Sequence, residues 1–503
     1  MSDQGMNRTE GSEDDRLGTD IKQHAERLSG IFSDTPDLIL RHFRIKQTNE
    51  KAILVYFEGL TDKNSINHDV LLPLQLHEGS GTPGGELITT VGYIDPVVSW
   101  SEIEKKLLQG SSLLFVEGRT EAFAMDTKGW PQRAIEDPQL ESSLKGAHQG
   151  FVETGGQNIA LLRRYIPNRE LKIKRLLVGK RGQTPISIVY LEDVVNADFL
   201  ADLEKRIQAI NTDVIINTGE LSDFIEDNPR SLFPQFIATE RPDAAASQIL
   251  QGRCIVIVDR SPSVLVAPVT FMSFFQSVDD YSTRWPISTF IRWLRLFAFF
   301  VAAFLPAFYI AVISYHFEII PLKLLLTLGQ SRGQVPFTPF MEAAIMEITL
   351  EMLREAGVRL PAPVGQTVGI VGGIVIGQAV VQAGLISNIM VIVVAFTAIS
   401  SFILPNYDMV AAVRLIRFMM MILASMFGFV GLIVGLMTMV AHLISLQSLG
   451  VPYGHPFAPV RFADWKDTVI RVPLWFMDKR PKSTSPKQER RQADSRIKKG
   501  DKP

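Results

Sequence analysis

The chain has 503 residues, 21% charged and 46% hydrophobic, with a formal net charge of −2. This balance, without a basic stripe, argues against a nucleic-acid-binding protein. A single cysteine, Cys254, excludes an intramolecular disulfide framework and suits a reducing compartment. Because the first twenty residues are polar and acidic, no signal peptide is expected and the N-terminal part is predicted to stay in the cytosol.

The N-terminal half is polar enough to be soluble. Residues 1–24 are predicted to be disordered, since they are rich in Gly, Asp and Glu. Residues 25–285 are predicted to form a cytosolic α/β domain with two subdomains, at about 25–145 and 165–270. No internal repeat is found.

Helical and strand-like patterns alternate through this domain, which is typical of an α/β fold. Pro242 and Asp243 suit the first turn of a helix, and Gly252 suits its end. The expected helices are 25–45, 197–210 and 242–251, and the expected strands are 51–57, 112–117, 121–125, 172–178, 185–192, 213–217, 254–258 and 264–266.

Residues 286–446 are predicted to form an all-α transmembrane domain. The 48 residues 360–407 contain no Asp, Glu, Lys or Arg, and a span needs about 20 residues, so this run holds two spans and a turn. In total about four transmembrane helices are expected, at 296–317, 364–383, 388–404 and within 418–446. The remainder, 447–503, is predicted to be a cytosolic basic tail, disordered from Met477 onward.

The predicted topology leaves one conflict. With both termini inside, four spans place Arg414 and Arg417 on the outer side, against the positive-inside tendency. A fifth span at 320–350 would repair this but would export the basic tail. Four spans are therefore expected, and the segment 321–356 stays open between re-entrant, interfacial and spanning.

Small residues recur along two of the spans. Without a hydrophobic reward for helix association in lipid, close backbone approach through glycine favours packing. A hinge or gate is the alternative, because bare backbone also permits bending. The candidate helix-packing glycines are Gly365, Gly369, Gly373, Gly377, Gly428, Gly431 and Gly435.

Polar groups within the spans are few and mostly neutral. They either hydrogen-bond between helices or face a water-filled pathway, and neutral amides and hydroxyls suit a pore or gate better than a proton relay. The pore or gate candidates are Gln378, Gln382, Asn388, Thr397, Ser400 and Ser401.

An amphipathic helix expected at about 338–356 carries three carboxylates on one face, Glu347, Glu351 and Glu355. In a ring of subunits they would form stacked acidic rings that concentrate cations. The alternative is a solvated face in which Glu355 pairs with Arg359 and Glu351 with Arg354.

Signatures of enzymes are missing from the sequence. It contains no HExxH, no phosphate-binding P-loop, no G-x-S-x-G and no Cys/His metal cluster. A non-enzymatic protein without cofactor or metal is therefore expected.

Seven ordered blocks resemble one family, the A subunits of bacterial spore germinant receptors (the GerA family), over roughly residues 25–480. The most specific block is GQTVGIVGGIVIGQAVVQAGLIS at 365–387. The others are GFVETGGQNIALLRR (150–164), FPQFIATERPD (233–243), QGRCIVIVDRSP (251–262), FFQSVDDY (274–281), LREAGVRLPAPVGQ (353–366) and HLISLQSLGVPY (442–453).

The resemblance implies a multi-pass protein of the spore inner membrane. It implies a receptor complex with a transporter-like B subunit and a lipoprotein C subunit, and an A subunit that oligomerises into a ligand-gated cation channel. Two alternatives remain: an accessory germination channel like the paralogous stage V sporulation protein AF, and a membrane scaffold that conducts nothing. The germinant, the stoichiometry and any ligand of the soluble domain are not encoded in a recognisable motif.

Overall fold

The structure is a computed structural model that describes residues 15–77, 84–85, 87–129, 141, 146, 148–361, 372–373 and 377–492. The chain divides into two compact units. The first comprises residues 1–226, 238–268 and 479–491, and the second comprises 227–237, 269–478 and 492–503.

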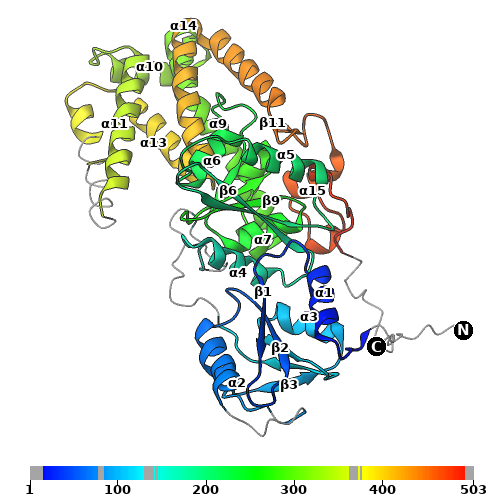
Figure 1. Cartoon of the computed structure of the whole chain (residues 1–503). Helices are drawn as coiled ribbons and strands as arrows, with labels where there is room; N and C mark the ends of the chain where they lie inside the picture. Colours follow the sequence, from blue (N-terminus) through cyan, green and yellow to red (C-terminus); the bar gives the residue numbers. More distant parts are fainter. Residues whose placement is uncertain are drawn as a thin grey trace, which may run out of the picture. The chain divides into compact units, whose positions relative to one another are not determined.

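The first unit begins with a five-stranded sheet that has helices on both faces (Figure 1). Across the sheet the strands are β1 (Leu38–Arg44), β2 (Lys51–Phe57), β4 (Ser112–Val116), β5 (Ala122–Met125) and β3 (Ile94–Val97), all paired antiparallel. The helices are α1 (Ile21–Ile31), the π-helical turn η2 (Ser65–Leu71), α2 (Leu72–Leu76) and α3 (Trp100–Leu108). Alternate residues of β2 serve two cores: Ile53 and Val55 pack with α1 and α3, whereas Leu54 packs with η2 and α2.

A second five-stranded sheet follows in chain order. Its strands are β6 (Leu171–Val178), β7 (Thr184–Leu191), β9 (Cys254–Val258), β10 (Val264–Ala267) and β8 (Ile237–Thr239), in that order. The accompanying helices are α4 (Gly155–Tyr165), α5 (Ala197–Gln208), α6 (Thr218–Ile225) and α7 (Pro242–Leu250). β9 is wholly buried, as expected of an apolar CIVIV strand.

The predicted α/β region is confirmed, as are β2, α5, α7 and the β9–β10 hairpin. Two predictions are wrong. The expected helix at 25–45 is α1 followed by β1, because Thr35-Pro36 and the positive φ of Asp34 interrupt it. The expected strand at 213–217 is irregular backbone, and Asn217 instead caps α6.

The boundary of the predicted disordered terminus also changes. Residues 1–14 lie outside the described part of the chain, but residues 21–24 belong to α1, whose first turn is capped by Asp20. At the other end, Arg480 donates to the carbonyl oxygen of Leu250 at 2.9 Å, so the disorder predicted from Met477 is wrong for this residue.

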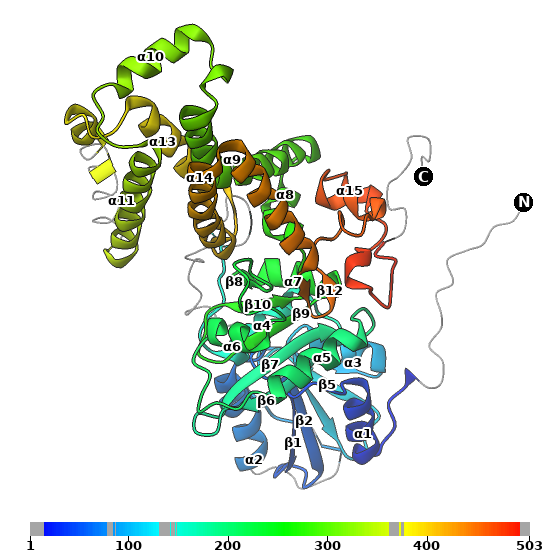
Figure 2. The same ribbon diagram turned by 90° about the horizontal axis from the view of Figure 1, so that it is seen from above.

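The second unit is mainly helical (Figures 1 and 2). Its longer helices are α9 (Trp285–Tyr315), α10 (Leu322–Arg332), α11 (Pro339–Arg359), α13 (Asn388–Ile403) and α14 (Tyr407–Ser445). Shorter elements are α8 (Asp279–Ser282), β11 (Gln447–Ser448), β12 (Val451–Pro452) and α15 (Trp465–Thr468). Among the described residues, two helices are long and apolar enough to cross a membrane, α9 and α14.

α14 bends sharply at Gly428, which has φ 58° and ψ −134°. A Cβ added at Gly435 would lie 2.5 Å from the sulfur of Met420, although 15 residues would separate the two by about 22 Å in a straight helix. The helix therefore turns back on itself, and Met420 and Leu423 lie against Gly431 and Gly435 beyond the bend. Tyr315 donates to the carbonyl oxygen of Ser425 at 2.6 Å, which satisfies one backbone group freed by the break.

These helices account for part of the predicted membrane topology. Three of the four expected spans fall in α9, α13 and α14, although α13 has only 16 residues, about 24 Å. The span expected within 418–446 is divided by the bend at Gly428. The span expected at 364–383 lies largely outside the described residues. The number four therefore stays a prediction.

Candidate functional site

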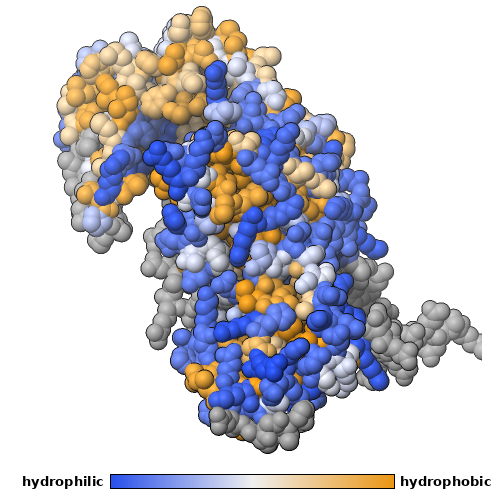
Figure 3. Space-filling view, viewed as in Figure 1, coloured by the Kyte–Doolittle hydropathy of each residue, from blue (hydrophilic) through white to orange (hydrophobic). Residues whose placement is uncertain are grey.

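Helix α11 exposes apolar side chains and buries carboxylates. Ile348 and Met352 are 51% and 60% exposed, whereas Glu342 and Glu347 are 0% and 1% exposed. A helix in water shows the opposite arrangement. Since α11 packs against α9, α13 and α14, these two carboxylates face the interior of this helical group. Figure 3 shows apolar side chains gathered over the part where Figure 1 labels α10 and α11.

The most buried of these charges is Glu347. Its Oε2 lies 2.5 Å from Nη1 of Arg417 on α14, and the two side chains are 1% and 2% exposed. Arg417 Nε also donates to the carbonyl oxygen of Ala302 on α9 at 2.7 Å. One arginine therefore connects three helices.

Two more carboxylates flank this pair. Glu351, one turn further along α11, lies 2.8 Å from Arg414 and 2.9 Å from Arg354. Towards the start of the helix, Glu342 pairs with Arg332 at 3.3 Å and accepts from the backbone N–H of Ser387 at 3.0 Å. We call Glu342, Glu347 and Glu351 with Arg332, Arg354, Arg414 and Arg417 the charge ladder.

The charge ladder is costly to bury. A buried ion pair loses hydration that its own attraction only partly repays, and removal of one partner typically costs about 3–5 kcal/mol. Glu347 Oε1 and Arg417 Nη2 have no hydrogen-bond partner among the described residues. Ionisable groups among membrane helices usually mark a pathway for ions or substrates. The pair is therefore a stronger functional candidate than a stabilising one.

The structure places the predicted pore or gate residues in two groups. Thr397, Ser400 and Ser401 are buried, and each hydroxyl donates to a carbonyl oxygen of its own helix α13, those of Val393, Phe396 and Ala398. Gln378, Gln382 and Asn388 are exposed. Their role in a pore stays a prediction.

The predicted packing glycines also divide. Gly365 and Gly369 lie outside the described residues. A Cβ at Gly373 or Gly377 would meet no described atom within 4 Å. Gly428, Gly431 and Gly435 are buried at the bend of α14, where added side chains would collide with Tyr315, the Leu423 carbonyl oxygen and Met420, respectively.

The alternative of a solvated face for the three predicted carboxylates fits the structure only in part. Glu355 pairs with Arg359 at 2.6 Å on the exposed surface, and Glu351 pairs with Arg354. Glu347 instead is buried, so a solvated face does not describe it. Acidic rings in an oligomer stay a prediction.

Sequence reasoning missed Glu342, Arg332 and the functional meaning of Arg414 and Arg417. A signal was present, because these last two arginines violate the positive-inside tendency and Arg417 directly precedes 43 residues without formal charge. Within the described part of the chain, no group of three or more His, Cys, Asp and Glu side chains could hold a metal ion.

Two long apolar helices and the buried paired charges suggest a protein that associates with a membrane, and comparison with known proteins defines its family. The family described as Bacillus/Clostridium GerA spore germination protein matches residues 26–483. Spore germination protein KA of Bacillus subtilis (strain 168) is 41% identical over 477 residues, 94% of this chain and 88% of that protein. Spore germination protein GerLA of Bacillus cereus is 37% identical over 88% of this chain and 92% of that protein.

The chain belongs to the GerA family of spore germination proteins. Among solved structures, the N-terminal domain of the A subunit of the Bacillus megaterium spore germinant receptor GerK3 is 25% identical, with a TM-score of 0.40. The match covers 51% of this chain and 97% of that one.

Proposed function

We propose that this protein is the A subunit of a spore germinant receptor and forms, as a homo-oligomer, a cation channel in the spore inner membrane. The channel opens when germinant binds to the receptor and thereby starts germination. The proposal rests on membership of the GerA family and on relatives that are named spore germination proteins. Its partners would be the transporter-like B subunit and the lipoprotein C subunit.

One observation supports conduction in particular, the charge ladder on α11. Three carboxylates lie inside a group of apolar helices, where lipid would tolerate them only if they were paired or faced water. In the described arrangement each has an arginine partner. A cation path along α11 requires these carboxylates to exchange arginine for water and cations, so the arginines act as internal counter-ions of the closed state.

The protein would act by shifting an equilibrium between closed and open states. A ligand can shift this equilibrium only by its difference in affinity for the two states. The helices α11, α13 and α14 would move, because the charge ladder links α11 to α14, and the pore or gate candidates Thr397, Ser400 and Ser401 lie on α13. Multi-pass insertion with the N-terminal region and the basic tail in the cytosol is part of the proposal.

Ion flux from liposomes tests this proposal. The full chain is reconstituted alone and with its B and C partners, and potassium release is measured with and without candidate germinants. We expect germinant-dependent release that requires all three proteins. Replacement of Gln378, Gln382 and Ser400 by apolar residues is expected to reduce the release.

The other outcomes separate the alternatives. Release from this chain alone, indifferent to germinants, would indicate an accessory channel of the stage V sporulation protein AF type. No release in any combination, with correct insertion confirmed, would indicate a scaffold without conduction.

A further inference from the structure

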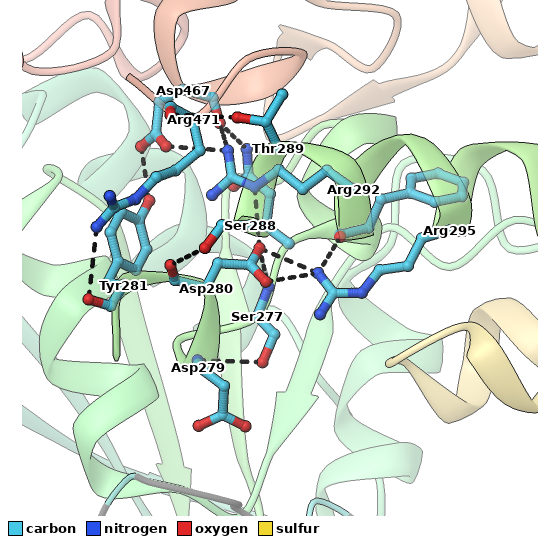
Figure 4. Close-up of polar contacts among 12 residues, drawn as sticks. Ser277, Asp279, Asp280, Tyr281, Ser288, Thr289, Arg292, Arg295, Asp467 and Arg471 are labelled. Atoms are coloured by element: carbon cyan, nitrogen blue, oxygen red, sulfur yellow. Dashed lines mark hydrogen bonds and ion pairs between the residues drawn. The ribbon is translucent and has the colours of Figure 1, made fainter. Parts of the chain in front are cut away.

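A buried polar cluster fixes part of the C-terminal region to the first turns of α9 (Figure 4). Asp280 lies 2.9 Å from Arg292 and 2.9 Å from Arg295, and Asp280 and Arg292 are 2% and 3% exposed. Arg292 also pairs with Asp467 at 3.0 Å. Arg292 therefore holds one carboxylate near its own helix and one from a segment about 175 residues away in sequence.

Further contacts hold the same segment along α9. Trp293 Nε1 donates to the carbonyl oxygen of Val469 at 3.0 Å, and Thr289 donates to that of Arg471 at 3.3 Å. Tyr281 donates to Asp467 at 2.6 Å. Burial and the neighbouring Asp467 carboxylate raise the pKa of the Tyr281 hydroxyl, so it stays protonated and remains a donor. We call residues 457–476 the C-terminal segment.

These contacts fix the depth of the C-terminal segment if α9 crosses the bilayer. The uncharged run of α9 starts at Leu296, and its 20 residues to Tyr315 span about 30 Å, the thickness of the hydrocarbon core. Trp293 and Thr289 precede Leu296 by about 5 and 11 Å along the helix. The headgroup layer is about 5–8 Å thick on each side. Val469, which Trp293 binds, therefore lies within the headgroup layer, and Arg471, which Thr289 binds, lies just beyond it on the water side.

The surface of the C-terminal segment suits that depth. Seven of its exposed side chains are large and apolar, and they include Phe462 at 72%, Phe476 at 61% and Trp475 at 40%. The first turns of α9 continue this surface with Trp285 and Trp293, which are 43% and 59% exposed. The full set in the segment is Phe457, Val460, Phe462, Ile470, Leu474, Trp475 and Phe476.

Basic side chains accompany this apolar surface. Arg461 and Lys466 belong to the segment, and ten Lys or Arg against four Asp or Glu follow from Met477 to the end. Exposed Trp and Phe combined with Lys and Arg are typical of segments that lie in the membrane interface and favour anionic lipids.

We propose that the C-terminal segment is an interfacial membrane anchor that binds anionic lipid headgroups, with its aromatic side chains at the boundary between headgroups and acyl chains. The predicted cytosolic tail then begins on the membrane surface instead of in free solution. The anchor requires α9 to span the bilayer, but it does not require the protein to conduct ions. Because Arg292 binds the segment through Asp467, the first turns of α9 and the segment on the membrane surface would move together.

Spin-label depth measurement tests the anchor on the full chain in nanodiscs that contain phosphatidylglycerol. The single native cysteine, Cys254, is buried, so an added cysteine takes the label selectively. Labels are placed by Phe462→Cys and Phe476→Cys, and collision with oxygen and with a water-soluble nickel complex gives the depth. Two reference labels are Lys205→Cys on the exposed face of α5 for water and Phe300→Cys on α9 for lipid.

We expect both segment labels at the boundary between headgroups and acyl chains, at a depth between those of the two references. Nanodiscs without anionic lipid should move them toward water, and Lys466→Gln should reduce that difference. Collision values equal to those of the Lys205 reference would overturn the proposal. Protection from both oxygen and nickel would also overturn it, because a partner protein or a second copy would then cover the surface.

Discussion

Helices α5 and α11 of this chain expose and bury opposite kinds of side chain. α5 buries Leu203 and Ile207 and exposes Lys205, so its apolar face lies in a protein core and its charges lie in water. α11 buries Glu342 and Glu347 and exposes Ile348 and Met352. We propose that the medium around each helix, water for α5 and lipid for α11, decides which face points outward.

The ion pairs of the two helices also differ in their burial. On α5, Arg206 and Asp202 are partly exposed and 2.8 Å apart, a pair that solvent screens and that contributes little. Glu347 and Arg417 are almost completely buried, so each depends on the other for its charge to be tolerated. The same residue types therefore have small structural effects in one unit and large effects in the other.

The largest effect is expected from Arg417→Met. It leaves the Glu347 carboxylate buried and unpaired, which costs about 3–5 kcal/mol of unfolding free energy. The double variant Glu347→Met/Arg417→Met should recover most of this loss, since no unpaired charge remains. Thermal unfolding in detergent measures both. The matched control is Arg359→Met, which breaks the exposed Glu355–Arg359 pair and should cost at most about 1 kcal/mol.

A second prediction concerns the exposed face of α11. If α11 lies in the membrane as proposed, Ile348→Lys places an ammonium group in lipid and should reduce membrane insertion by about 2–3 kcal/mol. Gln208→Lys on the exposed face of α5 should change stability by less than about 0.5 kcal/mol. Insertion efficiency and unfolding of the two variants give the comparison. Equal, negligible effects would mean that Ile348 faces water.

A smaller effect is expected at the bend of α14. Gly428→Ala should cost about 1–2 kcal/mol, because an L-residue is strained at φ 58° and its Cβ would lie 3.0 Å from the ring of His316. Gly329→Ala in α10 meets no described atom within 4 Å and should be neutral or slightly stabilising. If Gly428→Ala unfolds at the wild-type temperature, the bend is not part of the folded state.

The smallest effect is expected at the helix caps, where substitutions in α5 and α11 should cost the same stability. Asn196 caps α5 by accepting from Asp198 N–H, and Thr338 caps α11 by accepting from Met341 N–H. Asn196→Ala and Thr338→Ala should each cost about 1 kcal/mol, because a cap satisfies a local backbone donor. Melting temperatures measure both, and a large difference between them would show that the medium also acts on the caps.

Local patterns predicted much of the first unit and only part of the second. β2 was predicted at its observed bounds, and α7 followed from Pro242 and Asp243, because hydrophobic period and capping residues act within a few residues. The bend at Gly428 was not predicted, since a glycine in an apolar run fits a straight helix equally well. The Glu347–Arg417 pair joins residues 70 positions apart, and no local pattern encodes such a pairing.

The predicted acidic face illustrates the same limit. The spacing of Glu347, Glu351 and Glu355 placed them on one face, but it could not say what that face contacts. The structure buries the first, partly buries the second and exposes the third. Arg414 and Arg417, which depart from the positive-inside tendency, indicate what this face contacts. Both arginines pair with glutamates of α11.

The most direct measurement compares potassium release for Arg417→Met and Glu347→Gln, reconstituted with the B and C partners. Both variants break the same ion pair. If the carboxylate lines a cation path that Arg417 neutralises, release without germinant should rise in Arg417→Met, and germinant-dependent release should fall in Glu347→Gln. If the pair only holds helices together, both variants should lose release to the same extent, and this result would contradict the proposed role of the charge ladder in conduction.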